Sequence, residues 1–335
     1  MNDKKTLVIA LGPAGGILAA HLAHAGFRVY GVDIWTKHVD RIRESGLAVE
    51  GFASLAPRLL EAVPDISDLQ EKSFDYVVVA VKTPALPQAI ATLKKLRGEF
   101  RVVVYENGLD NEEYVAAFFD RSRVLRAAVN YAGNVVCPGR IRMNFFQRPN
   151  QLGCLCGGSG CGHANELAAM MTAASLDTVV AADIRRFTWK KTILNGSISP
   201  VSALAGLTMA DVMSDQGTRW MVEALARESI DVARAAGYEY GDGFFDDCIQ
   251  YLLKAGRHKP SMLVDLENGH STEIDYVNGK IAAYGRRLGV PVPFNTSMTA
   301  LVTAKASHLR GEKWLDQARI DMTRVPVPEP SAVAS

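Results

Sequence analysis

The sequence lacks an excess of charge of either sign. Its 37 lysines and arginines nearly balance its 36 aspartates and glutamates, which leaves a formal net charge of +1 over 335 residues. A broadly basic surface for nucleic acid or for an anionic membrane is therefore excluded, and we expect neither as a partner. Any anion that the protein binds must be held by local groups.

Long apolar runs are also missing, because no stretch approaches the roughly 20 uninterrupted apolar residues of a membrane-spanning helix. The first 25 residues combine lysines with an apolar segment, as a signal peptide does. The residues 12-GPAGG-16 would interrupt a signal helix, whereas a turn between a strand and a helix needs such residues. We therefore expect a cytoplasmic protein.

Cysteine is scarce, and its five copies are an odd number in a chain too large to need disulfide staples. We expect reduced thiols. Cys154, Cys156 and Cys161 lie close to His163 in the sequence. Zinc ligands usually come in C-x-x-C pairs, whereas here C-x-C precedes a lone cysteine among glycines. The pattern favours a glycine-rich turn after a strand, and we expect no metal.

The N-terminal half alternates apolar strands with helices. The strands are apolar throughout rather than on one face, which indicates a parallel sheet covered on both sides. This pattern predicts an α/β fold with a Rossmann-type doubly wound domain over residues 1–183. The expected strands are 27–33, 74–82 and 101–108, and the expected helices are 17–26, 37–46 and 84–96.

The remaining segments predict more strands and then a helical domain. Strand-like segments between 123 and 183, with 140–147 among them, are expected to extend the sheet, some of them antiparallel, beside one helix near 163–174. Residues 184–322 are predicted to form an all-helical domain, and the Pro-rich tail 323–335 is predicted to be disordered. Apolar stripes at helical period cover 186–206, 216–237 and 273–289.

The stretch 10-ALGPAGG-16 lies between an apolar run and a helix, where a dinucleotide-binding turn would read G-x-G-x-x-G. Ala10 replaces the first glycine, and its single methyl group is tolerated if its backbone dihedral angles stay in an ordinary region. Gly12 leaves space for a pyrophosphate, and Gly15 allows the helix to pack closely on the strand. The context predicts a working cofactor turn rather than an ordinary glycine-rich turn.

Asp33 ends the next strand. Its carboxylate can accept hydrogen bonds from an adenosine ribose and would repel a 2′-phosphate, which favours NADH over NADPH. The following residue is Ile34, where NADP enzymes of this type often have arginine. Lys37 and Arg41 are near enough in the sequence to reach a phosphate.

Two polar groups stand out in the second half. Lys191, Asn195 and Ser199 recur every four residues and line one helix face among apolar neighbours, which favours a pocket wall over a solvated face. His258 and Ser261 lie at a helix start marked by proline. Glu273 follows a Ser-Thr pair that can cap the next helix, and it could instead be a first-turn acid favoured by the helix dipole.

Together these segments resemble the ketopantoate reductase family, and the resemblance extends to about residue 310. The most specific motif is S-M-x-x-D followed by T-E-I-D-x-x-N-G. The segments that carry the resemblance are 12-GPAGG-16, 80-AVK-82, 106-ENGLDNEE-113, 189-WKKTILNGSISP-200, 260-PSMLVDLENGHSTEIDYVNG-279 and 289-GVPVPFN-295.

The resemblance implies a C-terminal domain like that of 6-phosphogluconate dehydrogenase and the NAD(P)H-dependent reduction of a 2-keto acid. The type reaction is ketopantoate to pantoate, in pantothenate biosynthesis. Lys191 would be the general acid, and Glu273 would orient Lys191 or the nicotinamide ribose. The implied cofactor contacts are Gly12, Pro13, Ala14, Gly15, Asp33, Lys82, Asn107, Ala132 and Glu273, and the implied substrate contacts are Asn107, Asn195, Ser199, His258 and Ser261.

Two positions depart from the family pattern, since Ser199 and His258 stand where asparagine is usual or frequent. They leave open an NAD-dependent 2-hydroxy acid dehydrogenase of the same family that acts on a different acid. A β-hydroxyacid dehydrogenase is disfavoured, because Phe187 stands where that group has glycine. A catalytically inactive cofactor-binding sensor is the alternative from another class, which the intact Lys191 and Glu273 argue against. A homodimer is the oligomer that we expect.

Overall fold

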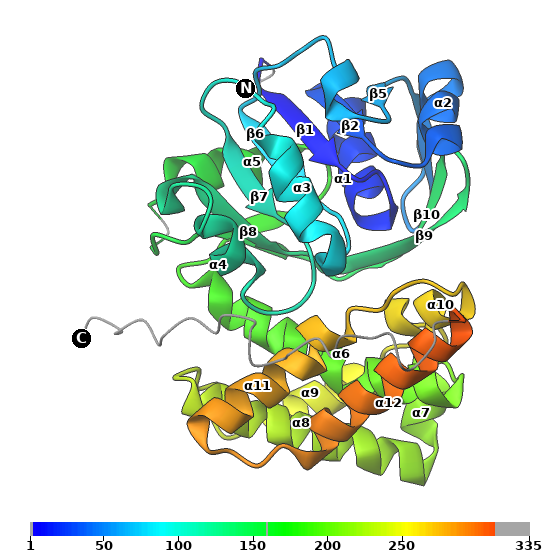
Figure 1. Ribbon diagram of the computed structural model, residues 1–335, viewed down its shortest axis with the longest axis vertical. Coiled ribbons are helices and arrows are strands. Elements are labelled where there is room, and N and C mark those ends of the chain that lie inside the picture. The colour runs from blue at the N-terminus through cyan, green and yellow to red at the C-terminus, as the bar shows by residue number, and fades with distance from the viewer. Residues whose placement is uncertain (1–2, 159, 312–335) are drawn as a thin grey trace. The chain divides into compact units, whose positions relative to one another are not determined.

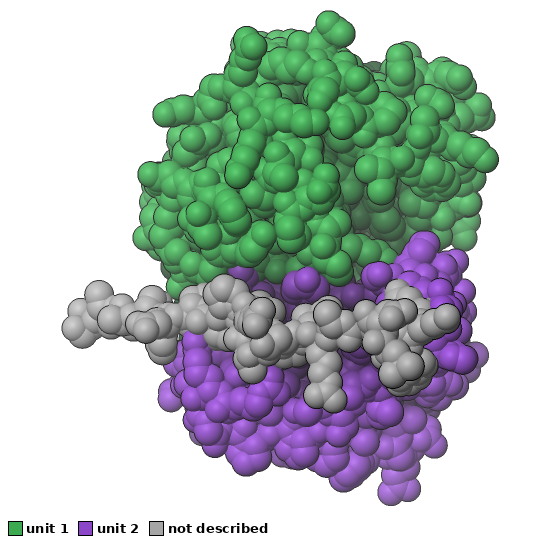
Figure 2. Space-filling view, viewed as in Figure 1, with its two compact units in different colours: residues 1–106, 111–187 green, residues 107–110, 188–335 purple. Residues whose placement is uncertain are grey.

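The computed structural model describes residues 3–158 and 160–311, which fall into two compact units (Figures 1 and 2). Unit 1 takes in residues 1–106 and 111–187, and unit 2 takes in 107–110 and 188–335. The division lies slightly beyond the expected boundary at residue 183, inside the continuous helix α6 (Ile184–Ala205). The tail predicted over 323–335 lies outside the described residues.

An eight-stranded sheet forms the centre of unit 1 (Figure 1). Across the sheet the strands are β12 (Thr178–Val180), β11 (Asn150–Cys154), β8 (Val124–Ala128), β7 (Arg101–Val104), β6 (Tyr76–Val79), β1 (Lys5–Ile9), β2 (Arg28–Val32) and β5 (Glu61–Val63). The run from β5 to β8 is parallel, and only the pairing of β8 with β11 is antiparallel. Its order is that of a Rossmann fold, which confirms the predicted doubly wound domain.

Helices cover both faces of this sheet. Successive residues of β1 are buried on opposite faces: Val8 belongs to the core beneath one set of helices, and Leu7 and Ile9 to the core beneath the other. This explains why the strands are apolar throughout. The first core includes residues of α1 (Pro13–His24), α2 (Thr36–Ser45) and α5 (Gly162–Ala173), and the second includes residues of α3 (Leu86–Leu93) and α4 (Asn111–Ala116).

A second, four-stranded sheet corrects one expectation. Its strands are β4 (Leu55–Arg58), β3 (Leu47–Gly51), β10 (Arg140–Phe146) and β9 (Tyr131–Cys137). The segment 140–147 therefore does not extend the main sheet as expected. Buried residues of β10 mostly alternate with exposed ones, which suits a sheet with one solvated face. Ile141 of β10 packs on α1, where a Cβ added at Gly16 would lie 2.2 Å from its Cδ1 atom.

Unit 2 is helical, as predicted. No helix in the described part of the chain is long and apolar enough to cross a membrane. Besides α6 the α-helices are α7 (Met209–Ser214), α8 (Gln216–Ala235), α9 (Phe244–Leu253), α10 (Ser261–Glu267), α11 (Asn278–Leu288) and α12 (Pro293–Leu309).

The helix expected over 273–289 is interrupted, and that prediction is wrong in its first turn. A short 3₁₀ turn, η4 (Ile274–Tyr276), comes first, and α11 starts only after Val277, whose ψ is −86°. The carbonyl of Tyr276 accepts from the N–H of Leu109 at 3.2 Å, a bond between segments far apart in the sequence. The expected capping by the Ser-Thr pair is wrong too, because Glu273 is the N-cap residue of η4 and makes no side-chain cap bond.

Candidate active site

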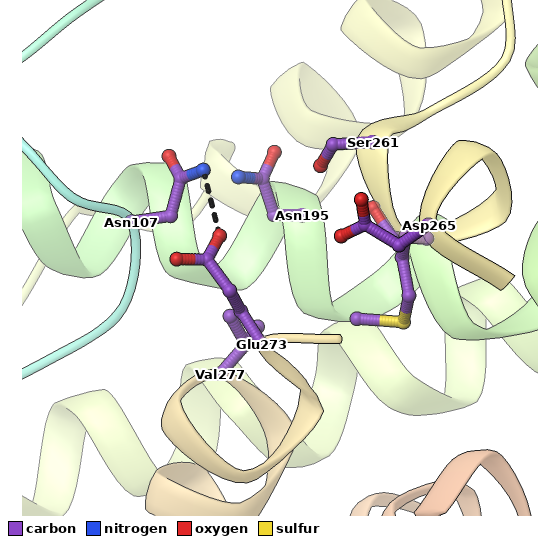
Figure 3. Close-up of a pocket in the computed structure, with 8 residues that line it drawn as sticks. Asn107, Asn195, Ser261, Asp265, Glu273 and Val277 are labelled. Atoms are coloured by element: carbon purple, nitrogen blue, oxygen red, sulfur yellow. Dashed lines mark hydrogen bonds between the residues drawn. The ribbon is translucent and has the colours of Figure 1, made fainter. Parts of the chain in front are cut away.

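A polar pocket in unit 2 gathers five residues that the sequence marks as site candidates (Figure 3). The amides of Asn107 and Asn195 and the hydroxyl of Ser261 face the same space as the carboxylate of Glu273. The side chains that line the pocket are Asn107, Asn195, Ser199, Ser261, Met262, Asp265, Glu273 and Val277. Hydrogen-bond donors and carboxylates thus share one small cavity, as the recognition of a polar metabolite requires.

Asn107 belongs to a short segment after β7 that is fixed to the helices of unit 2. The carboxylate of Asp110 forms an ion pair with the buried Lys280 at 3.0 Å and accepts from the hydroxyl of Tyr284 at 2.9 Å. Gly108 has a φ of +95°, and a Cβ there would lie 2.5 Å from the carbonyl of Tyr276, so glycine is required. The segment is thereby placed so that Asn107 Nδ2 donates to Glu273 Oε2 at 3.3 Å.

Asn195 and Ser199 reach the pocket from α6, which contains a proline beside them. Pro200 has no N–H with which to bond the carbonyl of Gly196. The Nδ2 group of Asn278, a fully buried residue of α11, donates to that carbonyl at 2.8 Å instead. This bond satisfies a group that the proline would otherwise leave unpaired in the interior.

Helix α10 brings Ser261 and Asp265 to the pocket. They are four residues apart and share one helix face. Asp265 is 8% exposed and was missed as a site residue by the sequence analysis. The signal for it was present, because it is the acid of the S-M-x-x-D motif and lies one turn beyond Ser261. Met262 and Val277, also missed, are the apolar part of the wall.

Of the residues predicted to catalyse the reaction or to bind the substrate, two are not among those that line this pocket. Lys191 lies on α6, one helical turn before Asn195, and is partly buried. His258 lies in the loop before α10, where its carbonyl accepts from the N–H of Met209 at 3.1 Å. Burial lowers the pKa of His258, against the opposing effect of a hydrogen bond that its ring donates to the backbone of Ala255, and this favours the neutral imidazole.

The glycine turn after β1 corrects the expectation for Ala10, whose φ is +72° and lies in the left-handed region. The N–H of Ala10 still donates to the carbonyl of Val32 at 2.7 Å, so Ala10 continues the pairing of β1 with β2 and also begins the turn. A Cβ at Gly15 would lie 2.1 Å from the Ala10 carbonyl oxygen. Close packing of α1 on the turn therefore explains why this residue is glycine. A Cβ at Gly12 would meet nothing within 4 Å, so the helix start is open to a phosphate.

Asp33 is fixed at the end of β2, beside this turn. Its Oδ2 accepts from the backbone N–H of Leu11 at 2.7 Å, and its Oδ1 accepts from that of Trp35 at 2.8 Å. Each carboxylate oxygen can accept more than one hydrogen bond, so both retain capacity for ribose hydroxyls. Ile34 is 92% exposed beside it.

The other predicted cofactor residues also belong to unit 1. Pro13 is the first residue of α1. The hydroxyl of Tyr131 donates to the carbonyl of Ala14 at 2.9 Å, which ties the start of α1 to β9. Ala132 follows Tyr131 on that strand, and Lys82 is exposed shortly after β6, the neighbour of β1 in the sheet.

A doubly wound unit with a nucleotide-type turn, joined in one chain to a helical unit with a polar pocket, is typical of nicotinamide-dependent oxidoreductases. Two family models match the chain: ketopantoate reductase PanE/ApbA over residues 7–156, and its C-terminal part over residues 183–306. The chain belongs to the ketopantoate reductase family.

Named relatives agree with this assignment. A 2-dehydropantoate 2-reductase of Mesorhizobium japonicum is 31% identical over 89% of this chain and 96% of its own length. The solved structure of a PanE/ApbA family ketopantoate reductase from Ralstonia eutropha covers 91% of this chain and 99% of its own, with a TM-score of 0.82 and 26% identity. D-mandelate dehydrogenase with NADH and anilino(oxo)acetate shares the fold, at a TM-score of 0.84 and 24% identity over 92% of this chain and all of its own.

Proposed function

We propose that this chain reduces a 2-keto acid to the 2-hydroxy acid with NAD(P)H, with ketopantoate as the substrate of the type reaction. One observation carries the proposal: Asn107, Asn195, Ser261 and Glu273, which lie far apart in the sequence, line the same pocket. These are residues that the family resemblance assigns to substrate and cofactor. Relatives named 2-dehydropantoate 2-reductase support the same reaction.

The residues of unit 1 fit a nicotinamide dinucleotide. The open position at Gly12 suits a pyrophosphate at the start of α1, and the fixed carboxylate of Asp33 suits the ribose hydroxyls. Pro13, Ala14 and Gly15 complete the turn. We propose NADH as the preferred cofactor, because the carboxylate repels a 2′-phosphate and Ile34 beside it offers no positive charge. When bound, the cofactor supplies the hydride.

Each residue of the proposed machinery has one task. The amide of Asn195 and the hydroxyl of Ser261 bind the substrate hydroxyl and carboxylate by hydrogen bonds. Lys191 donates a proton to the substrate oxygen as the carbonyl becomes an alkoxide, and its positive charge stabilises the negative charge that develops there. Glu273 accepts a hydrogen bond from Asn107, and its task is to orient Lys191 or the nicotinamide ribose. Lys82 and Ala132 are proposed to contact the cofactor.

A different 2-hydroxy acid is the second candidate substrate, and one observation favours it. Ser199 lines the pocket where the family usually has the larger asparagine. A shorter side chain enlarges this part of the wall and removes an amide, which suits an acid with a bulkier or less polar tail. His258 also departs from the pattern, but it does not line the pocket, and we therefore give Ser199 the greater weight in substrate choice.

A substrate panel separates these readings. We expect oxidation of NADH, faster than that of NADPH, with at least one 2-keto acid from a set that contains ketopantoate and aromatic and branched analogues. A preference for ketopantoate supports the type reaction, whereas a preference of more than about a hundredfold, about 2.7 kcal/mol, for another member supports the second candidate. Cofactor binding without turnover of any member would support the sensor. Light scattering on the same sample tests the expected homodimer.

A further inference from the structure

Three cysteines of unit 1 converge just beyond the end of β11. Cys154 is the last residue of that strand, Cys156 follows it closely, and Cys161 precedes α5. Their sulfur atoms all lie within 4.8 Å of one another, and those of Cys154 and Cys156 are 2.9 Å apart. The predicted glycine-rich turn is present, but the spacing of the cysteines in the sequence does not reveal that the three thiols meet.

Two glycines shape the loop that follows Cys154 and Cys156. Gly157 and Gly158 have φ values of +77° and +82°, which favour glycine, and the N–H of Gly158 bonds the carbonyl of Ala182 at 3.0 Å. A Cβ at either glycine would meet no atom within 4 Å, so the loop is open on that side. Cys154 is 4% exposed, whereas Cys156 is exposed to solvent. The cluster therefore has a buried base and an accessible rim.

The three thiols are the candidate metal ligands of this cluster, because the nearest histidine has another partner. His163 is engaged elsewhere, because its Nε2 atom lies 2.7 Å from a guanidinium nitrogen of Arg101, which can only donate. Arg121, paired with Glu113 at 2.6 Å, interacts electrostatically with Cys156.

We propose that Cys154, Cys156 and Cys161 form a binding site for one thiophilic closed-shell cation, Zn²⁺ or Cu⁺. Thiolates select these ions, and a metal–sulfur bond of about 2.3 Å places three sulfurs around one centre at separations of roughly 4 Å, so the sulfurs of Cys154 and Cys156, 2.9 Å apart here, must separate by about 1 Å on binding. Each coordinated thiol releases its proton to solvent, and no electron is transferred. For Zn²⁺ the accessible rim at Cys156 leaves room for water as a fourth ligand. The bound cation links the end of β11 to the start of α5.

The test uses the full chain, reduced with a phosphine and stripped of metal. Zn²⁺ and Cu⁺ are titrated separately against chromophoric competitors, and the thermal unfolding midpoint is measured with and without each ion. We expect one equivalent of at least one ion and a higher midpoint, because the ion binds the folded state. Cys156→Ser, at an exposed position, should weaken binding at least about tenfold. Cys137→Ser and Cys248→Ser should leave binding unchanged.

The ion that is retained more tightly identifies the metal. Three results would overturn the proposal: neither ion binds, binding is the same in Cys156→Ser, or the Cys137 and Cys248 variants lose as much affinity as Cys156→Ser. The proposal would also be contradicted if the untreated protein contained a disulfide between Cys154 and Cys156 and if the protein, after reduction of that disulfide, retained no ion. The folding of each variant is checked by circular dichroism, and Cys161→Ser serves as the second test at the rim if Cys156→Ser is not folded.

Discussion

Gly12 and Gly15 of the cofactor turn are glycine for different reasons, and single substitutions can separate them. A Cβ at Gly12 would meet no atom of the chain, and its φ of −64° is ordinary. Gly12→Ala should therefore leave the free energy of unfolding within about 0.5 kcal/mol of wild type. The same methyl group would occupy the space proposed for the pyrophosphate, so the affinity for NADH should fall at least about tenfold, about 1.4 kcal/mol.

Gly15→Ala is the matched control for this prediction. Its Cβ would lie 2.1 Å from a backbone oxygen, so the main effect of this variant should be a lower free energy of unfolding. Urea unfolding and fluorescence titration with NADH measure the two effects. If Gly12→Ala binds NADH as wild type does, the pyrophosphate is not held at this turn.

Ala10 carries backbone strain that the missing glycine of the fingerprint would relieve. A left-handed conformation costs an L-residue about 1–2 kcal/mol, and glycine avoids this cost. Glycine also gives the unfolded chain more conformational entropy, which lowers the free energy of unfolding by about 0.4–1 kcal/mol and offsets part of the gain. Ala10→Gly should therefore raise the free energy of unfolding by up to about 1 kcal/mol. Ala20→Gly, in the interior of α1, should lower it by about 1 kcal/mol. Equal destabilisation by both variants in urea unfolding would rule out the strain.

At the scale of elements, a hydrogen bond from Asn278 of α11 satisfies the carbonyl of Gly196 that Pro200 leaves without a helix partner inside α6. Asn278→Leu removes the Nδ2 donor and leaves the buried carbonyl of Gly196 unpaired, which should cost about 1–3 kcal/mol. Pro200→Ala restores a backbone N–H to that carbonyl. In the Pro200→Ala background, Asn278→Leu should therefore cost measurably less.

A double-mutant cycle in urea measures this coupling. The bond of Asn278 Nδ2 to Asn295 Oδ1, at 3.0 Å, is lost in both backgrounds and cancels in the cycle. A coupling free energy near zero would mean that Asn278 stabilises unit 2 without serving the proline.

The elements that the sequence predicted correctly are those with strong local patterns. The apolar strands of the main sheet and the long amphipathic helices of unit 2 are present near the predicted bounds. The second sheet was not predicted, because the pairing of β3 with β10 joins residues far apart in the chain. At the break before α11, a tertiary bond joins the Leu109 N–H to the Tyr276 carbonyl, and no local sequence pattern reveals this contact.

At the scale of the whole molecule, the candidate site is built from segments that only folding brings together. Asn107 follows a strand of the Rossmann half, and Glu273 lies far along the chain, yet the two side chains are hydrogen-bonded. The resemblance to a family suggested a role for each residue, but it could not show this contact. Asp265 was missed although its motif was recognised. The orientation of its side chain toward the pocket depends on the packing of α10, which the sequence does not show.

The general acid is the central claim of the proposed function. We would measure NADH oxidation with the preferred 2-keto acid for wild type, Lys191→Ala and the neighbouring exposed control Lys190→Ala. The account predicts that Lys191→Ala retains NADH affinity and loses kcat by about 10²–10⁴-fold, while Lys190→Ala keeps nearly full activity. Full turnover by folded Lys191→Ala, or an equal loss in both variants, would contradict it.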